Sequence, residues 1–300
     1  MPESNNGSGK RKTTLFDTLT DPFGLVYPFN PKTHEIYFLG PETVIAEATG
    51  MVGSGKDKHI KIAVTELPQD SELVDVFGRP IRVRTFKPNN LIKQGYEKNT
   101  ETRAILDRLI NRNTASLLES LAEMRSKGDS PFTPVELDLV LLNRGPYDNI
   151  RWTRALYDYG FLSREDMERN TGMANEVLEY ISLVANFSIP VDEAIRRESR
   201  RESKSEDEDL GKVMGDRRFL EILQGHYEAL SKEISTYGHP LGFGEDVECI
   251  YIDGMADLAA NSRRFMGALR TKLLSSAEER RYRGESEGAD PERREELLQA

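Results

Sequence analysis

The period of the apolar residues changes near residue 88, and this change limits the folds open to the chain. Before it lie short β-branched or aromatic runs that alternate in part, at 35–39, 43–49, 59–66, 73–77 and 81–86. Turns rich in Gly and Pro separate these runs, and the gaps are too short for the helical crossovers that parallel strands need. After it, apolar residues recur at helical spacing. The sequence therefore predicts an α+β fold that begins with an antiparallel β unit.

The clearest helix start lies at Thr133, which is followed by Pro134 and, three residues on, by Glu136. This is the pattern of a capping box with proline in the first turn, and it predicts a helix over 134–143. The other expected helices are 100–128, 149–159, one capped by Ser163 and Asp166, 174–185, 219–234 and 258–273, and a strand is expected at 247–252.

These patterns divide the chain into segments. The segments are a disordered arm at 1–24, an antiparallel β unit at 25–90, a helical domain with a helix-turn-helix-like segment at 91–190, a charged linker at 191–212, a small helical C-terminal module at 213–276 and a charged tail at 277–300. The linker is inferred because 196–209 holds no apolar residue and its basic half precedes its acidic half.

Charge and cysteine content exclude several classes of protein. The chain carries 51 acidic and 41 basic residues, a net charge of −10, which opposes duplex DNA unless the bases gather on one face. The single cysteine, Cys249, allows no intrachain disulfide or thiolate zinc site and indicates a reducing compartment. The apolar runs are too short to span a bilayer, and no secretory signal is recognised. We expect a cytoplasmic protein.

One segment has the spacing of a phosphate-binding loop. Gly50 and Gly55 are followed by Lys56, directly after a strand. However, Asp57 stands where such loops carry a magnesium-binding hydroxyl, and 59–66 reads as a strand, which leaves no helix N-terminus for the phosphates. The pattern therefore favours a hairpin loop, with a nucleotide hydrolase as an alternative.

A second segment, 162–183, resembles a helix-turn-helix unit, with Gly172 at the turn. Its second helix would expose Asn175, Glu176 and Glu179, and no Lys or Arg occurs at 174–187. Carboxylates are unfavourable against phosphates, so a structural helical unit is the preferred interpretation. A DNA-binding regulator that uses Asn175 stays open as an alternative.

No catalytic constellation is visible. The four histidines lie far apart, no Ser/His/Asp arrangement is present, and Cys249 has no adjacent base. The sequence therefore predicts a protein that is not an enzyme and that holds no cofactor and no metal.

Arginines on one strand are the candidate binding residues. Arg79, Arg82 and Arg84 lie on a hairpin, where Arg82 and Arg84 share one face. Their guanidinium groups could grip carboxylates of a partner protein, and a solvated sheet face is the alternative. Trp152, the only tryptophan, is expected between helices and would be a natural anchor if exposed.

One stretch resembles a known family. Residues 79–86 form an Arg-Pro-containing strand, and Phe132-Thr-Pro-Val-Glu136 follows later, with Leu141-Leu142 and Arg144 after it. This is similar to the tail and baseplate assembly proteins (assembly chaperones) of contractile-tailed phages. The resemblance implies a non-enzymatic assembly factor or minor tail component in the host cytoplasm or the virion. It would bind tail or baseplate proteins. The acidic net charge disfavours a nucleic-acid partner, and the protein could form oligomers.

Overall fold

The computed structural model describes residues 29–30, 35–86, 133–175, 178–202, 216–237 and 247–287. The predicted arm at 1–24 and the predicted helix at 100–128 lie outside these ranges. The strands are β1 (Phe29–Asn30), β2 (Glu35–Gly50), β3 (Val83–Phe86), β4 (Thr133–Asn143), β5 (Leu183–Ser188) and β6 (Glu248–Asp253). The helices are α1 (Lys56–Glu66), η1 (Leu67–Gln69), α2 (Ser71–Phe77), α4 (Pro146–Asp158), α5 (Arg164–Asn175), η5 (Leu178–Tyr180), α6 (Val191–Glu202), α8 (Arg217–Tyr237) and α9 (Leu258–Glu287).

The sheet has the strand order β3-β4-β2-β5-β6, and every pair along this path is parallel. The short β1 adds an antiparallel pairing to β2. Strand β2 is central: Ala46 lies beside Leu141 of β4 on one side and Leu183 of β5 on the other. The chain builds one side of the sheet from β2 and then returns to build the other, so β2 marks a topological switch point.

The predicted α+β fold with an antiparallel β unit is therefore wrong. Two of its expected strands, 59–66 and 73–77, are helices α1 and α2, which supply the crossover between β2 and β3. In α1 the buried residues Ile60 and Ala63 follow helical spacing, and the Asp70 side chain accepts a hydrogen bond from the Leu73 amide at the start of α2. Over so short a run, the apolar positions fit both the two-residue period of a strand and the 3.6-residue period of a helix. Packing of one helical face against the sheet stabilises the helix here.

Strand β4 replaces the helix predicted at 134–143. Its residues from Leu137 to Leu142 are all buried, because helices cover both faces of the sheet. Burial on both faces is typical of an interior parallel strand, and it outweighs the local capping-box signal. Pro134 is tolerated because β3 pairs with β4 only from Leu139 onward, so β3 forms no ladder with the start of β4.

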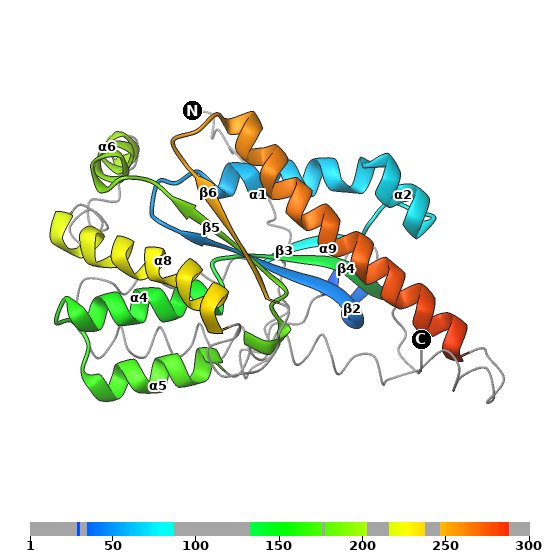
Figure 1. The fold of residues 1–300 in the computed structure, drawn as a ribbon, viewed down its shortest axis with the longest axis horizontal. Helices are drawn as coiled ribbons and strands as arrows, with labels where there is room; N and C mark the ends of the chain where they lie inside the picture. Colours follow the sequence, from blue (N-terminus) through cyan, green and yellow to red (C-terminus); the bar gives the residue numbers. More distant parts are fainter. Residues whose placement is uncertain are drawn as a thin grey trace, which may run out of the picture.

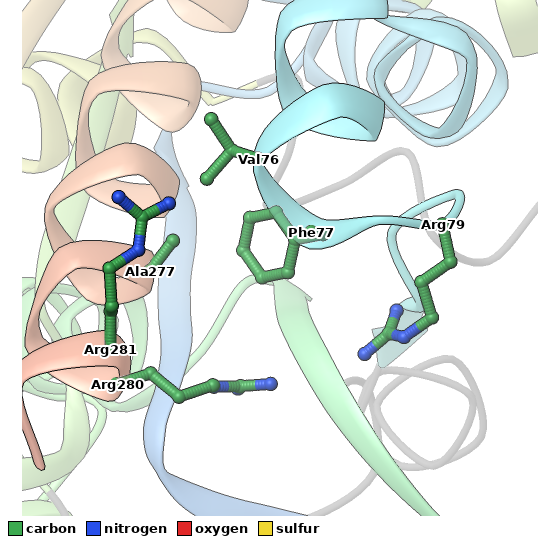
Figure 2. A pocket seen from close by; sticks show the side chains of 6 residues that line it. All are labelled: Val76, Phe77, Arg79, Ala277, Arg280 and Arg281. Atoms are coloured by element: carbon green, nitrogen blue, oxygen red, sulfur yellow. The ribbon is translucent and has the colours of Figure 1, made fainter. Parts of the chain in front are cut away.

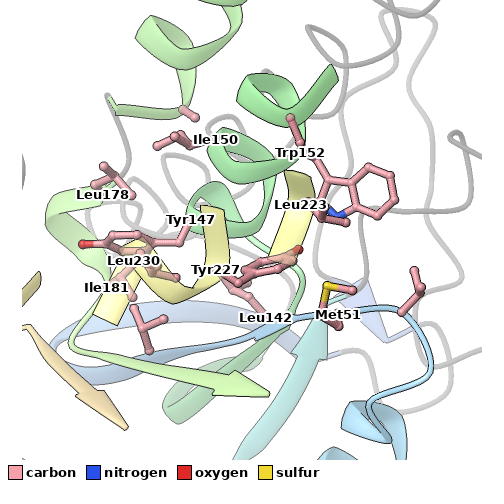
Figure 3. Close-up of a cluster of buried hydrophobic side chains, with 14 of the residues drawn as sticks. Met51, Leu142, Tyr147, Ile150, Trp152, Leu178, Ile181, Leu223, Tyr227 and Leu230 are labelled. Carbon is pink, nitrogen blue, oxygen red and sulfur yellow. The ribbon is translucent and has the colours of Figure 1, made fainter. Parts of the chain in front are cut away.

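Helices cover the two faces of the sheet in separate layers (Figure 1). On one face α1, α2 and α9 pack over a core that includes Ile60, Leu73 and Phe265. On the other face α4, α5, α6 and α8 enclose a second core (Figure 3), in which Tyr147 and Tyr227 are fully buried. The single sheet draws its strands from the predicted segments 25–90, 91–190 and 213–276.

Several segments expected to be irregular or helical differ from the prediction. Helix α6 occupies the first part of the predicted charged linker, and α9 continues to Glu287 within the predicted charged tail. Helix α5 ends at Asn175, and residues 183–188 form β5, so the predicted second helix of the helix-turn-helix is absent. No helix in the described ranges is long and apolar enough to cross a membrane.

Candidate phosphate-binding site

The loop Gly50–Lys56 joins β2 to α1 at the carboxyl ends of the parallel strands, at the switch point of the sheet. Its glycines Gly50, Gly53 and Gly55 have φ values of 126°, 70° and 90°, which other residues adopt only with strain. Helix α1 begins at Lys56, so the positive end of its dipole faces the loop. The predicted hairpin loop is wrong: the strand, loop and helix needed for phosphate binding are all present.

Lys56 places a positive charge inside this loop. The side chain is only 6% exposed, and its Nζ donates to the carbonyl oxygens of Gly50 at 2.7 Å and Met51 at 3.1 Å. The ammonium group also lies 3.4 Å from Ser54 Oγ. The loop therefore holds the cation that a bound phosphate group requires.

Arg197, on α6, connects the loop to α6 and to the turn after β6. Its guanidinium donates to the Gly53 carbonyl oxygen at 2.9 Å and to the Gly254 carbonyl oxygen at 3.0 Å. Glu193 orients it from one turn earlier, with an Nε–Oε1 distance of 2.5 Å. A Cβ at Gly254 would lie 2.4 Å from Ile189 Cγ2 and 3.0 Å from the Ser54 carbonyl oxygen, so glycine lets the turn after β6 pack closely on both neighbours. Loop, α6 and this turn form one side of the site.

Asp57, in the first turn of α1, faces the end of β4. The Asn143 Nδ2 donates to Asp57 Oδ1 at 2.5 Å. Asp57 is exposed, whereas Asn143 is the buried last residue of β4. The carboxylate thus lies beside the side-chain amide of Asn143, on the strand next to β2.

Asp148, on α4, accepts hydrogen bonds from the end of β2, where the loop begins. Its Oδ1 accepts hydrogen bonds from Thr49 Oγ1 at 2.9 Å, from the Gly50 amide at 3.3 Å and from the Tyr227 hydroxyl at 2.7 Å. Burial raises the pKa of Tyr227 well above its usual value, so this hydroxyl stays a donor. One carboxylate therefore fixes the end of β2 to α4, which carries Asp148, and to α8, which carries Tyr227.

Glu47 is a second buried acid at the N-terminus of α4. It accepts the amides of Tyr147 at 2.9 Å and Asp148 at 2.6 Å. Gly145 is needed beside it, because a Cβ there would lie 2.7 Å from Glu47 Oε2. Burial, and then the charge of Asp148, raise the pKa of Glu47 to about 8, although the amides of Asp148, Tyr147 and Gly145 act in the opposite direction.

This raised pKa predicts a pH-dependent stability. Between its unfolded pKa of about 4.3 and the folded value of about 8, the native protein holds a proton at Glu47 that the unfolded chain releases. The free energy of unfolding should therefore fall as the pH rises through this window, by up to about 1.4 kcal/mol per pH unit. Urea unfolding of the wild type and Glu47→Gln between pH 5 and pH 8 measures this, and the variant should lack that slope. Equal slopes in both proteins would refute the assignment.

The arginines predicted to bind a partner do not converge. Arg79 forms a two-pronged ion pair with buried Asp138, at 2.6 and 2.9 Å. Its side chain, with Phe77 and Arg280, borders a cavity of about 240 Å³ between α2 and α9 (Figure 2). Arg82 is exposed, and the Arg84 guanidinium donates to the Val83 carbonyl oxygen at 3.2 Å. A partner-binding role for these arginines stays a prediction.

The other two candidate residues are on helices α4 and α5. Trp152 belongs to the buried cluster (Figure 3) and is 5% exposed. It packs on Phe219 with ring centroids 5.3 Å apart and lies under the Arg144 guanidinium at 5.3 Å. It is therefore an interior residue and no exposed anchor. Asn175 is the last residue of α5 and stands on no recognition helix.

Sequence reasoning found the loop motif but missed the residues that complete the site. These are Glu47, Asn143, Asp148 and Arg197. Asn143 and Asp148 flank a Gly-Pro pair, which signals the strand-to-helix junction at which α/β proteins place polar side chains. Arg197 stood in a run of charges read as a linker, and Glu47 in a strand whose neighbours were unknown.

Comparison with known proteins gives a likeness of structure and none of sequence. No protein-family model and no curated protein matches the chain. A solved structure of deoxyadenosine kinase from M. mycoides, with the products dCMP and a flexible dCDP bound, aligns with a TM-score of 0.51 and 15% identity over 76% of this chain and 100% of that one. Structures of the same enzyme with dATP and with dCTP bound give TM-scores of 0.49 at 16% and 15% identity, each over 76% of this chain and 100% of theirs.

These findings correct the remaining expectations. The resemblance to phage tail and baseplate assembly proteins is wrong, because the short motifs that carried it lie on parallel strands of an α/β fold. The expectations of a non-enzymatic assembly protein with virion partners, and of a DNA-binding regulator, are contradicted by the same fold, which that nucleotide-binding enzyme shares. The chain shares its parallel α/β fold with that deoxyadenosine kinase.

Proposed function

We propose that the chain is a kinase that transfers a phosphoryl group from a nucleoside triphosphate to a nucleoside or nucleoside monophosphate. The observation that carries this proposal is the loop Gly50–Lys56 between β2 and α1 at the switch point of a parallel sheet. Ligands of open α/β sheets bind at such a point, outside the carboxyl ends of the strands. The likeness in fold to a deoxyadenosine kinase supports the choice of acceptor.

The loop supplies what phosphoryl transfer requires of a protein. Such transfer depends mainly on positioning and on stabilising charge, since the protein does little covalent chemistry. Loop amides and the first turn of α1 would hold the β- and γ-phosphates, with the Lys56 ammonium neutralising their charge. Arg197 fixes the outer edge of the loop through its hydrogen bond to the Gly53 carbonyl oxygen.

Kinases of this kind use magnesium bound to the triphosphate, and the residues beside Lys56 fit this ion. The Asp57 carboxylate, at the start of α1, offers an oxygen ligand, and the side-chain amide of Asn143, at the end of β4, holds that carboxylate through its Nδ2. Magnesium binds through one or two carboxylates together with substrate phosphates and water. Among the described residues no group of three or more His, Cys, Asp or Glu side chains could hold a metal alone, so the nucleotide must contribute ligands. When bound, the ion would neutralise charge on the transferred phosphoryl group.

The test is a transfer assay with the full chain, MgATP and a panel of deoxynucleosides and deoxynucleoside monophosphates. We expect ADP to form in step with one phosphorylated acceptor, as resolved by chromatography. ADP formed without any phosphorylated acceptor would identify a nucleotide hydrolase instead. Failure to bind any nucleoside triphosphate in calorimetry would refute the proposal. We also propose a cytoplasmic location, where ATP is available and the lone Cys249 would stay reduced.

A further inference from the structure

The residue pair at the end of β4 and the start of α1 departs from the usual chemistry of a phosphate loop. In the common arrangement a Ser or Thr hydroxyl follows the loop lysine, and an aspartate on another strand helps to hold magnesium. Here the residue after Lys56 is Asp57, and the side chain that it contacts from the neighbouring strand is Asn143. The acid and the neutral group are present, but in exchanged positions.

We propose that Asp57 and Asn143 form a charge-exchanged magnesium pair, in which the carboxylate comes from α1 and the neutral partner from β4. This inference rests on the proposed function, because the ion arrives with the nucleotide. The pair keeps one negative charge at the site, as the common arrangement does. Asp57 is exposed and can reach a cation, while the Asn143 amide, 2.5 Å away, orients its carboxylate.

Electrostatics give the pair a clear signature. Without a cation, the Asp57 carboxylate lies in the first turn of the helix whose N-terminus would receive the triphosphate, so the two anions repel. With a cation between them, the same carboxylate attracts the complex. Nucleotide affinity should therefore depend more steeply on magnesium than if a hydroxyl stood at position 57.

The experiment compares ATP affinity in magnesium and in EDTA, by calorimetry, for four proteins: the wild type, Asp57→Ser, Asn143→Asp and the double variant. Magnesium should raise affinity in the wild type, and Asp57→Ser should reduce this enhancement by about tenfold or more. Asn143→Asp alone sets two carboxylates against each other and should weaken metal-free binding further. The double variant rebuilds the common arrangement and should return the enhancement to within about threefold of the wild type.

Direct binding of Mn²⁺ in the presence of ATP, followed by electron paramagnetic resonance, gives a readout that is independent of activity. Asp57→Asn, which keeps the shape of the side chain, replaces Asp57→Ser if circular dichroism shows that the latter is unfolded. An unchanged magnesium enhancement in either Asp57 variant that still binds ATP would overturn the pair and leave the proposed kinase standing. Absence of ATP binding in the wild type would overturn both.

Discussion

Lys56→Ala is expected to weaken MgATP binding by about ten- to a hundredfold and to slow phosphoryl transfer by about a further hundredfold. The ammonium is held within the loop by the Gly50 and Met51 carbonyl oxygens, so its charge is already where a phosphate would bind. A charge placed in advance costs no rearrangement when negative charge develops during the reaction. Calorimetry and initial-rate assays measure the two effects.

Lys61→Ala is the matched control, because Lys61 lies on the same helix but is exposed one turn beyond the loop. It removes the same charge from the protein and should leave affinity and rate within about twofold. Thermal unfolding of both variants shows whether loss of the Lys56 hydrogen bonds also loosens the fold. Equal effects of the two substitutions would mean that net charge, and not the loop ammonium, determines binding.

Gly50→Ala is expected to lower the free energy of unfolding by about 3 kcal/mol or more. A Cβ at this position would lie 2.0 Å from the Phe187 carbonyl oxygen, and the backbone has a φ of 126°. The atom that blocks it is backbone, and this backbone also accepts the Met51 amide at 3.1 Å, so it cannot move aside without opening the loop. Urea unfolding gives the loss, and nucleotide binding should fall with it.

Gly78→Ala isolates the conformational part of this effect. Gly78 also has a positive φ, 66°, but a Cβ there would meet no atom within 4 Å. Its cost should be about 1 kcal/mol, from backbone strain alone. If both variants lost the same stability, contact between β2 and β5 would not be what requires glycine at position 50.

The elements that could be predicted are those whose apolar pattern has a single explanation. Residues 219–234 and 258–273 are long enough for helical spacing to be unambiguous, and both predictions are confirmed by α8 and α9. The strand expected at 247–252 is confirmed by β6. The helix predicted over 134–143 is wrong because a proline with a nearby acid imitates a helix start. The alternation of apolar and acidic residues over 135–139 is the strand signal that this apparent start obscured.

The prediction of a hairpin loop at the phosphate-binding site was wrong for a related reason. The glycines and Lys56 have the spacing of a phosphate-binding loop, but residues 59–66 alternate like a strand, and this argues against such a loop when the sequence is read alone. Once α1 is a helix, the spacing regains its usual meaning. Asp57 also argues against a phosphate-binding loop in the sequence, because its contact with Asn143 becomes visible only once β4 is known to lie beside β2. No local pattern could reveal that Arg197 reaches a carbonyl oxygen 144 positions away in the sequence.

The hydrogen bonds from Arg197 to the Gly53 and Gly254 carbonyl oxygens affect when the nucleotide site can form during protein synthesis. The loop is made early, yet the guanidinium that secures it and the Gly254 turn packed against it are made much later. Contacts that join such distant positions form slowly, because a long stretch of chain must first be brought together. A ribosome-bound nascent chain that has not yet exposed residue 254 should therefore lack a finished nucleotide site.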